Sequence, residues 1–297
     1  MAEQRNIGRR LRDFVEGLGA ALIFGFFRTL PMRWASELGG FLARNVGPRL
    51  GVSKRADLNL RLAMPELDTK ARRRIIRGMW DNLGRVGAEY PHIHNVDVFA
   101  SKGRVEVLGF EKILAERQPG RRYIFFSAHY GNWELGLQCS TQAGFDTVSV
   151  YRAPNNPWIE RLIDRGRRMP KLEMIPKGAA ASRRLLAALN RGSQLCILVD
   201  QKMNDGIPVP FFGRPAMTAP ALARLALRFN CIVVPVRVER LPKTRFRLIA
   251  DPPIAYARTG NAERDTLALM TEVNAALERW IRAKPDQWFW LHRRWSD

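Results

Sequence analysis

Residues 121–136, RRYIFFSAHYGNWELG, predict a buried strand followed by a tight turn and the start of a helix. The aromatic and β-branched run before the serine is typical of a strand that is covered on both faces, so His129 stands where this strand ends. Gly131 lets the backbone turn sharply, and Asn132 is expected to cap the helix. Glu134 falls in the first helical turn, and we expect its carboxylate to reach back to the His129 imidazole.

A histidine and a carboxylate on one turn can act together as a general base. Glu134 would fix the tautomer of His129 and stabilise the imidazolium that forms when His129 takes a proton from an attacking hydroxyl. Such catalysis accelerates a reaction roughly 100- to 10,000-fold and needs no nucleophilic Ser or Cys. Backbone N–H groups around Gly131 and Asn132, at the helix N-terminus, are expected to hold the developing oxyanion of the substrate.

The spacing H-x-x-x-x-E from His129 to Glu134 resembles the H-x-x-x-x-D/E motif of the glycerolipid and lysophospholipid acyltransferase superfamily. Its surroundings, SAHYGNWEL, resemble the lipid A late acyltransferases, the lauroyl and myristoyl transferases of Gram-negative envelopes. Further stretches resemble the same family in the same order: YRAPNNP at 151–157, PFFG at 210–213 with Thr218 and Pro220, and WFWLHRRW at 288–295. The resemblance extends over nearly the whole chain.

The resemblance implies an O-acyltransferase that moves a fatty acyl chain from an acyl-acyl-carrier-protein to a hydroxyl of a 3-hydroxyacyl chain on a Kdo-bearing lipid A precursor. His129, assisted by Glu134, would activate the hydroxyl for direct attack on the thioester, without a covalent enzyme intermediate. The family segment that matches Arg152 and its neighbours helps to bind the phosphorylated or sugar head of the acceptor. The resemblance also implies a place at the cytoplasmic face of the inner (plasma) membrane.

Polar residues follow two other predicted strands, Arg152 and Asp200. In a largely parallel sheet the carboxyl ends of the strands meet at one edge, so we expect both residues to converge with His129 and to bind substrate. Arg152 could instead only cap its strand. The resemblance assigns Gly213 and Thr218 to the acceptor side, although a structural turn explains the Gly and Pro residues of this loop equally well.

The composition indicates a polyanionic partner. The chain has 297 residues, with 49 Lys and Arg against 28 Asp and Glu, and a formal net charge of +21 at pH 7. An anionic membrane, a phosphorylated lipid or nucleic acid would each fit this charge, but no sequence module that reads nucleic acid is present. A run of seven cations could dock an acidic carrier protein or face solvent: Arg165, Arg167, Arg168, Lys171, Lys177, Arg183 and Arg184.

Neither a metal nor another cofactor is expected. The three cysteines lie in apolar segments without a C-x-x-C pairing, which indicates reduced core thiols. His92 and His94 would face the same way on an extended backbone, but no third ligand stands at a suitable spacing. Glycine-rich nucleotide-binding loops are also missing from the sequence.

The N-terminal segment, residues 1–30, is expected to associate with a membrane. Its uncharged run at 17–27 would form about 17 Å of helix, whereas a span needs about 20 residues. We therefore expect it to lie in the bilayer interface, with its arginines near anionic headgroups. A buried core helix, a tilted span and a cleaved signal peptide are the alternatives.

The rest of the chain, 31–297, is predicted to be an α/β acyltransferase domain with a mixed, largely parallel sheet flanked by helices. It would comprise a helical part at 31–103, an α/β core at 104–260, and a C-terminal helix and strand at 261–297. Strands are predicted at 104–108, 122–128, 146–151, 194–200, 231–238 and 245–250. Helices are predicted at 31–47, 53–63, 68–94, 110–117, 132–143, 156–168, 178–190, 217–229 and 261–283. The final aromatic segment could instead form an interfacial belt.

Three rival functions stay open on the sequence. The same chemistry could serve another acceptor, such as a glycerophospholipid or a glycolipid. A lipid hydrolase would use water in place of the hydroxyl, although the G-x-S-x-G motif of covalent hydrolases is missing. A basic nucleic-acid-binding protein is suggested by charge alone.

Overall fold

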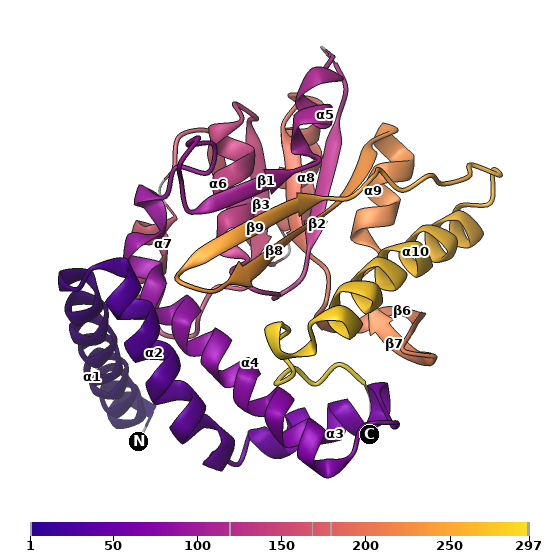
Figure 1. The fold of residues 1–297 in the computed structure, drawn as a ribbon. Coiled ribbons are helices and arrows are strands. Elements are labelled where there is room, and N and C mark those ends of the chain that lie inside the picture. Colours follow the sequence, from indigo (N-terminus) through magenta and orange to yellow (C-terminus); the bar gives the residue numbers. More distant parts are fainter. Residues whose placement is uncertain (1, 119, 168, 179, 296–297) are drawn as a thin grey trace.

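The computed structural model describes residues 2–118, 120–167, 169–178 and 180–295, with side chains from Gly8 onward. A twisted sheet occupies the centre of the molecule, and the N-terminal helices gather at one end of it (Figure 1). These N-terminal elements are α1 (Ala2–Thr29), α2 (Met32–Val46), the 3-10 turn η1 (Gly47–Arg49), α3 (Ser53–Ala63), α4 (Thr69–Glu89) and the 3-10 turn η2 (Tyr90–Asn95).

The central region alternates strands with helices, as predicted. Its elements are β1 (Val105–Leu108), α5 (Phe110–Ala115), β2 (Tyr123–Ser127), α6 (Glu134–Gln142), β3 (Thr147–Tyr151), α7 (Pro157–Gly166), β4 (Leu172–Pro176), α8 (Ala181–Asn190), β5 (Gln194–Leu198), β6 (Lys202–Phe211), β7 (Arg214–Thr218), α9 (Ala221–Phe229), β8 (Ile232–Leu241) and β9 (Arg245–Ala250). The chain continues through α10 (Ala262–Ala283) and the 3-10 turn η3 (Pro285–Gln287).

The main sheet has seven strands in the order β1-β9-β8-β2-β5-β3-β4. All neighbours are parallel except β8 and β9, which pair antiparallel. The predicted α/β class with a largely parallel sheet is therefore confirmed.

Strand β2 shows why the sheet has a core on each face. Side chains alternate along a strand, and in β2 Ile124 and Phe126 belong to one buried cluster, whereas Tyr123 and Phe125 belong to the other. A central parallel strand needs apolar residues at every position for this reason.

Three strands were not predicted, and one predicted strand is wrong. β4 follows a short turn after α7, and β6 pairs with β7 in a separate two-stranded hairpin. Proline is tolerated in such an edge ribbon, so the Pro-rich segment that we expected to be a loop is a hairpin. The segment 288–295 forms no regular strand; only an isolated bridge joins Trp288 to Tyr130.

Helix α1 packs on the surface of the molecule. Its Phe14 ring contacts Trp158 edge-on at 5.5 Å, and Phe24 contacts Tyr90 at 6.4 Å, while Leu22 and Ile23 are exposed. Within the described ranges, no helix combines the length and apolarity that a membrane span requires. Membrane association of α1 stays a prediction.

Candidate active site

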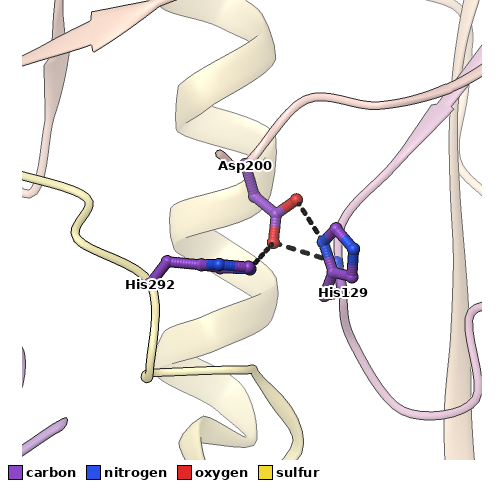
Figure 2. A group of neighbouring side chains, drawn as sticks. All are labelled: His129, Asp200 and His292. Carbon is purple, nitrogen blue, oxygen red and sulfur yellow. Dashed lines mark hydrogen bonds and ion pairs between the residues drawn. The ribbon is translucent and has the colours of Figure 1, made fainter. Parts of the chain in front are cut away.

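The register of two neighbouring strands brings His129 and Asp200 together. β2 and β5 are parallel, with Ser127 opposite Leu198, so the residue two positions beyond each strand end lies at the same height. His129 Nδ1 is 2.9 Å from Asp200 Oδ1, and the His129 backbone N–H donates to Asp200 Oδ2 at 2.9 Å (Figure 2). The expected convergence of these two residues at the sheet edge is confirmed.

Asp200 is a fully buried carboxylate. Besides the two donors on His129, it accepts a hydrogen bond from Trp288 Nε1 at 2.9 Å. Burial raises the pKa of Asp200, but the neighbouring His129 and its hydrogen bonds outweigh burial and hold this pKa well below its usual range. The ionised carboxylate can only accept, so Nδ1 of His129 carries the proton and Nε2 is left as the basic nitrogen.

His292 completes the group, although no site role was predicted for it from the sequence. Its Nε2 lies 4.0 Å from Asp200 Oδ2, and its ring contacts the His129 ring with centroids 5.0 Å apart (Figure 2). Burial lowers the pKa of His292 to about 4, so this imidazole is neutral at pH 7. The alternation of Trp288, Trp290 and His292 in the last segment was the signal that could have placed it beside the site.

The turn after His129 is held by a buried ionic network. Gly131 has a φ of +55°, and a Cβ there would meet the Val238 carbonyl oxygen at 1.7 Å, so only glycine fits. Asn132 does not cap α6 as expected; its Nδ2 donates to Glu89 Oε2 at 2.7 Å. Glu89, which is fully buried, also accepts from Arg240 Nη2 at 2.9 Å. The network fixes the turn on α4 and β8.

The expected contact between Glu134 and His129 is corrected by the structure. Glu134 opens α6, but its carboxylate accepts from Arg167 Nη2 at 2.7 Å, from Arg167 Nε at 3.1 Å and from Trp133 Nε1 at 3.1 Å. A fork-shaped guanidinium satisfies both oxygens of a carboxylate at once, so Arg167 competes successfully for Glu134. Asp200 is the carboxylate that orients the imidazole.

One of the two expected oxyanion donors has a partner within the protein. The Gly131 N–H donates to the Gln287 carbonyl oxygen at 2.9 Å, so it is already used within the protein. The Asn132 side chain is buried and bound to Glu89. Neither Gly131 nor Asn132 lines the cavity described next. Their substrate-binding roles stay predictions.

A cavity of about 270 Å³ opens beside His129. Its interior is mostly apolar, and its lining includes Phe126, Leu137, Cys139, Met174, Cys196 and Ile197. The polar part of the lining includes His129, Glu134 and Arg152. The three cysteines of the chain are buried, as predicted, and none is bonded to another. An apolar chain with a polar, reactive end is the ligand that fits this lining.

The other predicted site residues lie apart from this cavity or are paired elsewhere. Gly213 is exposed at the β6–β7 turn, and Thr218 is buried and accepts from Arg294 Nη2 at 2.9 Å. Of the predicted cationic run, Arg184 pairs with Glu173 at 3.0 Å and Arg167 pairs as described above, so these two do have acidic partners. Arg168 lies outside the described residues. The substrate roles of Arg152, Gly213 and Thr218 stay predictions.

Only one group among the described residues has the composition of a metal site. One ligand atom each from His129, Asp200 and His292 lies within 4.8 Å of the others, and two imidazoles with a carboxylate suit zinc. The two oxygens of Asp200 already accept three hydrogen bonds, which accounts for Asp200 and His129 without an ion, whereas the buried His292 Nε2 has no hydrogen-bond partner among the described residues. His92 and His94 lie in the η2 turn, where His92 Nε2 contacts the Phe27 carbonyl oxygen at 2.9 Å.

Comparison with known proteins gives matches over most of the chain. Residues 4–297 match the family model described as bacterial lipid A biosynthesis acyltransferase. The chain is 27% identical over 248 residues to the lipid A biosynthesis lauroyltransferase of Escherichia coli K12, and the alignment covers 80% of this chain and 77% of the relative. It is 24% identical over 268 residues to the lipid A biosynthesis palmitoleoyltransferase of the same organism, covering 84% of each. A Haemophilus influenzae lipid A biosynthesis acyltransferase is 23% identical over 271 residues, covering 88% of this chain and 81% of the relative.

Proposed function

This chain belongs to the bacterial lipid A biosynthesis acyltransferase family and is an O-acyltransferase of that type, and we propose that it transfers a fatty acyl chain from an acyl-acyl-carrier-protein to a hydroxyl of a 3-hydroxyacyl chain on a Kdo-bearing lipid A precursor. The observation that carries the proposal is the pairing of His129 with a fully buried, ionised Asp200 beside a largely apolar cavity.

In the proposed reaction, His129 Nε2 accepts the proton of the acceptor hydroxyl while that oxygen attacks the thioester carbonyl carbon. The carbon–sulfur bond breaks, and the proton on His129 passes to the departing thiolate, so an ester and a free carrier thiol are formed. Asp200 holds the reactive tautomer and stabilises the imidazolium. Transfer is direct, because the base and the cavity suffice without a nucleophilic side chain.

The Glu134–Arg167 pair has a different task in this proposal. Both residues line the cavity, and their bidentate contact fixes the start of α6 beside the imidazole. Arg152, which is exposed at the cavity, is available to a phosphate or carboxylate of the acceptor. The apolar interior would hold the acyl chain, and each buried methylene contributes about 0.8 kcal/mol.

The proposed location is the cytoplasmic face of the inner membrane, where acceptor and carrier protein meet. Exposed apolar residues of α1, such as Leu11, Leu22 and Ile23, support an interfacial position. The net charge of +21 suits both an anionic bilayer and an acidic carrier protein.

The decisive experiment measures acyl transfer from a panel of carrier-protein thioesters to a Kdo-bearing lipid A precursor by mass spectrometry. Wild type should add one acyl chain, and His129→Ala should add none while still unfolding cooperatively. Release of free fatty acid that carries labelled water oxygen, without transfer, would indicate a hydrolase instead. Activity only on a glycerophospholipid would change the acceptor and leave the chemistry in place.

The role of the cavity is tested through chain length. Cys196→Met narrows the cavity with an apolar side chain, so the preferred thioester should become shorter. Cys231→Met is the matched control, because Cys231 is buried but does not line the cavity. An unchanged chain-length profile in Cys196→Met would place the acyl chain elsewhere.

A further inference from the structure

A second, larger depression in the surface is lined by residues of α2, η1, α3 and α4. These elements lie along one side of the molecule (Figure 1). The depression measures about 1110 Å³ and shares no lining residue with the cavity beside His129. Six cationic side chains line it, against the single carboxylate of Asp57: Arg44, Arg49, Lys54, Arg61, Arg73 and Arg77. We call this depression the basic groove.

Four of these cations have no acidic partner among the described residues. Arg44 is paired with Asp81 at 2.6 Å, and Arg61 with Asp57 at 2.7 Å. The other four are exposed and make no ion pair with a described carboxylate: Arg49, Lys54, Arg73 and Arg77. Four uncompensated cations along one groove attract a multivalent or repeated anion.

The rim of the basic groove is aliphatic. Leu50 is 45% exposed and Leu58 is 44% exposed, and both line the groove. Val46 and Val52 are exposed beside them in the chain. Aliphatic side chains next to unpaired cations fit the boundary of a bilayer, where headgroup phosphates lie directly above acyl chains.

The surrounding segment has the same character. Among the described residues, all the exposed large apolar side chains lie between Leu11 and Leu58 except Phe99, Leu108, Trp158 and Leu267. α1 and α2 carry most of them, and Figure 1 shows these helices at the lower left and α3 at the lower right, all on the lower side of the molecule. A nucleic-acid groove would instead present aromatic stacking surfaces between its cations.

We propose that the basic groove binds the phosphate of an anionic membrane phospholipid and thereby docks α2 and α3 on the bilayer beside α1. The inference rests on the membrane location proposed above but not on the reaction at His129. Each Lys or Arg near an anionic surface contributes about 1 kcal/mol, so loss of all four unpaired cations should weaken binding at least about 100-fold.

The test is co-sedimentation of the full chain with phosphatidylcholine vesicles, with and without phosphatidylglycerol. The groove variant carries four substitutions, Arg49→Gln, Lys54→Gln, Arg73→Gln and Arg77→Gln. Its control carries the same change of charge at exposed cations on other elements: Lys112→Gln, Arg121→Gln, Arg224→Gln and Arg264→Gln. Wild type and control should bind vesicles that contain phosphatidylglycerol with similar affinity, and the groove variant should lose this binding at least about 100-fold.

Three results would overturn the inference. The first is a groove variant that binds the vesicles as tightly as the control does. The second is displacement of wild type from the vesicles by inorganic phosphate at the same concentration as the phosphatidylglycerol. Wild type that binds neither vesicle would remove the membrane location itself. Acyl transfer to a detergent-dispersed acceptor, measured on the same preparations, tests the proposed reaction separately, because the groove variant should keep that activity.

Discussion

Replacement of Asp200 by Asn tests which carboxylate orients His129. Two donors, the His129 backbone N–H and Trp288 Nε1–H, converge on Asp200 Oδ2, and one donor, His129 Nδ1–H, points at Oδ1. An Asn side chain has one acceptor oxygen. That oxygen satisfies more donors at the Oδ2 position, so the amide NH₂ would face His129 Nδ1.

An NH₂ group facing Nδ1 forces the other tautomer, in which the proton sits on Nε2 and the imidazole cannot accept the substrate proton. The corresponding Asp→Asn change in serine proteases lowers kcat about 10,000-fold for this reason. The same loss here would raise the activation free energy by about 5 kcal/mol. Substrate binding should change little, because Asp200 is fully buried and does not line the cavity.

The assay is single-turnover acyl transfer with saturating thioester, followed by mass spectrometry, for wild type, Asp200→Asn and Glu134→Gln. We expect a rate loss of about 1,000- to 10,000-fold for Asp200→Asn. Glu134→Gln disturbs the contacts with Arg167 and Trp133 but leaves the His129–Asp200 pair in place, so its rate should fall less. If Asp200→Asn keeps more than a tenth of the wild-type rate while Glu134→Gln abolishes it, the pairing seen in the structure is not the one that acts in catalysis.

Three further predictions concern stability. In the unfolded chain His292 binds a proton below its ordinary pKa of 6.5, whereas in the folded protein it does so only near pH 4. The free energy of unfolding of wild type should therefore fall by up to about 3 kcal/mol as the pH drops through this range. In urea unfolding, His292→Gln should show a weaker dependence of this free energy on pH. Gly131→Ala places a Cβ 1.7 Å from the Val238 oxygen at a φ of +55°, and should lower the free energy of unfolding by more than about 2 kcal/mol, seen as a lower Tm. Arg240→Met strands the buried Glu89 carboxylate and should cost about 3–5 kcal/mol in urea unfolding, most of which Glu89→Gln in the same chain should restore.

The fold was predictable where local pattern and burial agree. The run before His129 has the composition of a strand. The position of His129 at the carboxyl end of a buried parallel strand followed from the alternation of strands and helices. Arg152 and Asp200 were expected at the same edge for the same reason, and the β2–β5 register brings Asp200 to the imidazole.

The partner of His129 was not predictable from local spacing. Glu134 is five residues away in the chain, but Arg167 arrives from α7 and takes both of its oxygens. Asp200 is 71 residues from His129, and only the strand order makes them neighbours. His292 is still farther from His129 along the chain. Its place was missed because its segment was expected to form a strand, whereas it packs beside the site without regular structure.

The β6–β7 hairpin was missed for a different reason. Its prolines and glycines have the composition of a loop, and local propensity gives no sign that a two-stranded ribbon will pack on α10. Its Thr218 accepts a hydrogen bond from Arg294 of the last segment, so this hairpin also holds the tail.

The position of Trp288 in the chain also sets the order in which the site can be completed during synthesis. Trp288 follows Asp200 by 88 residues, which ribosomes need roughly 4–18 s to add at roughly 5–20 residues per second. Throughout that interval β2 and β5 already exist, while the third donor to Asp200 and the His292 ring do not. Asp200 therefore lacks one of its three donors, and His129 lacks the neighbouring His292 ring, until the last segment of the chain has been added.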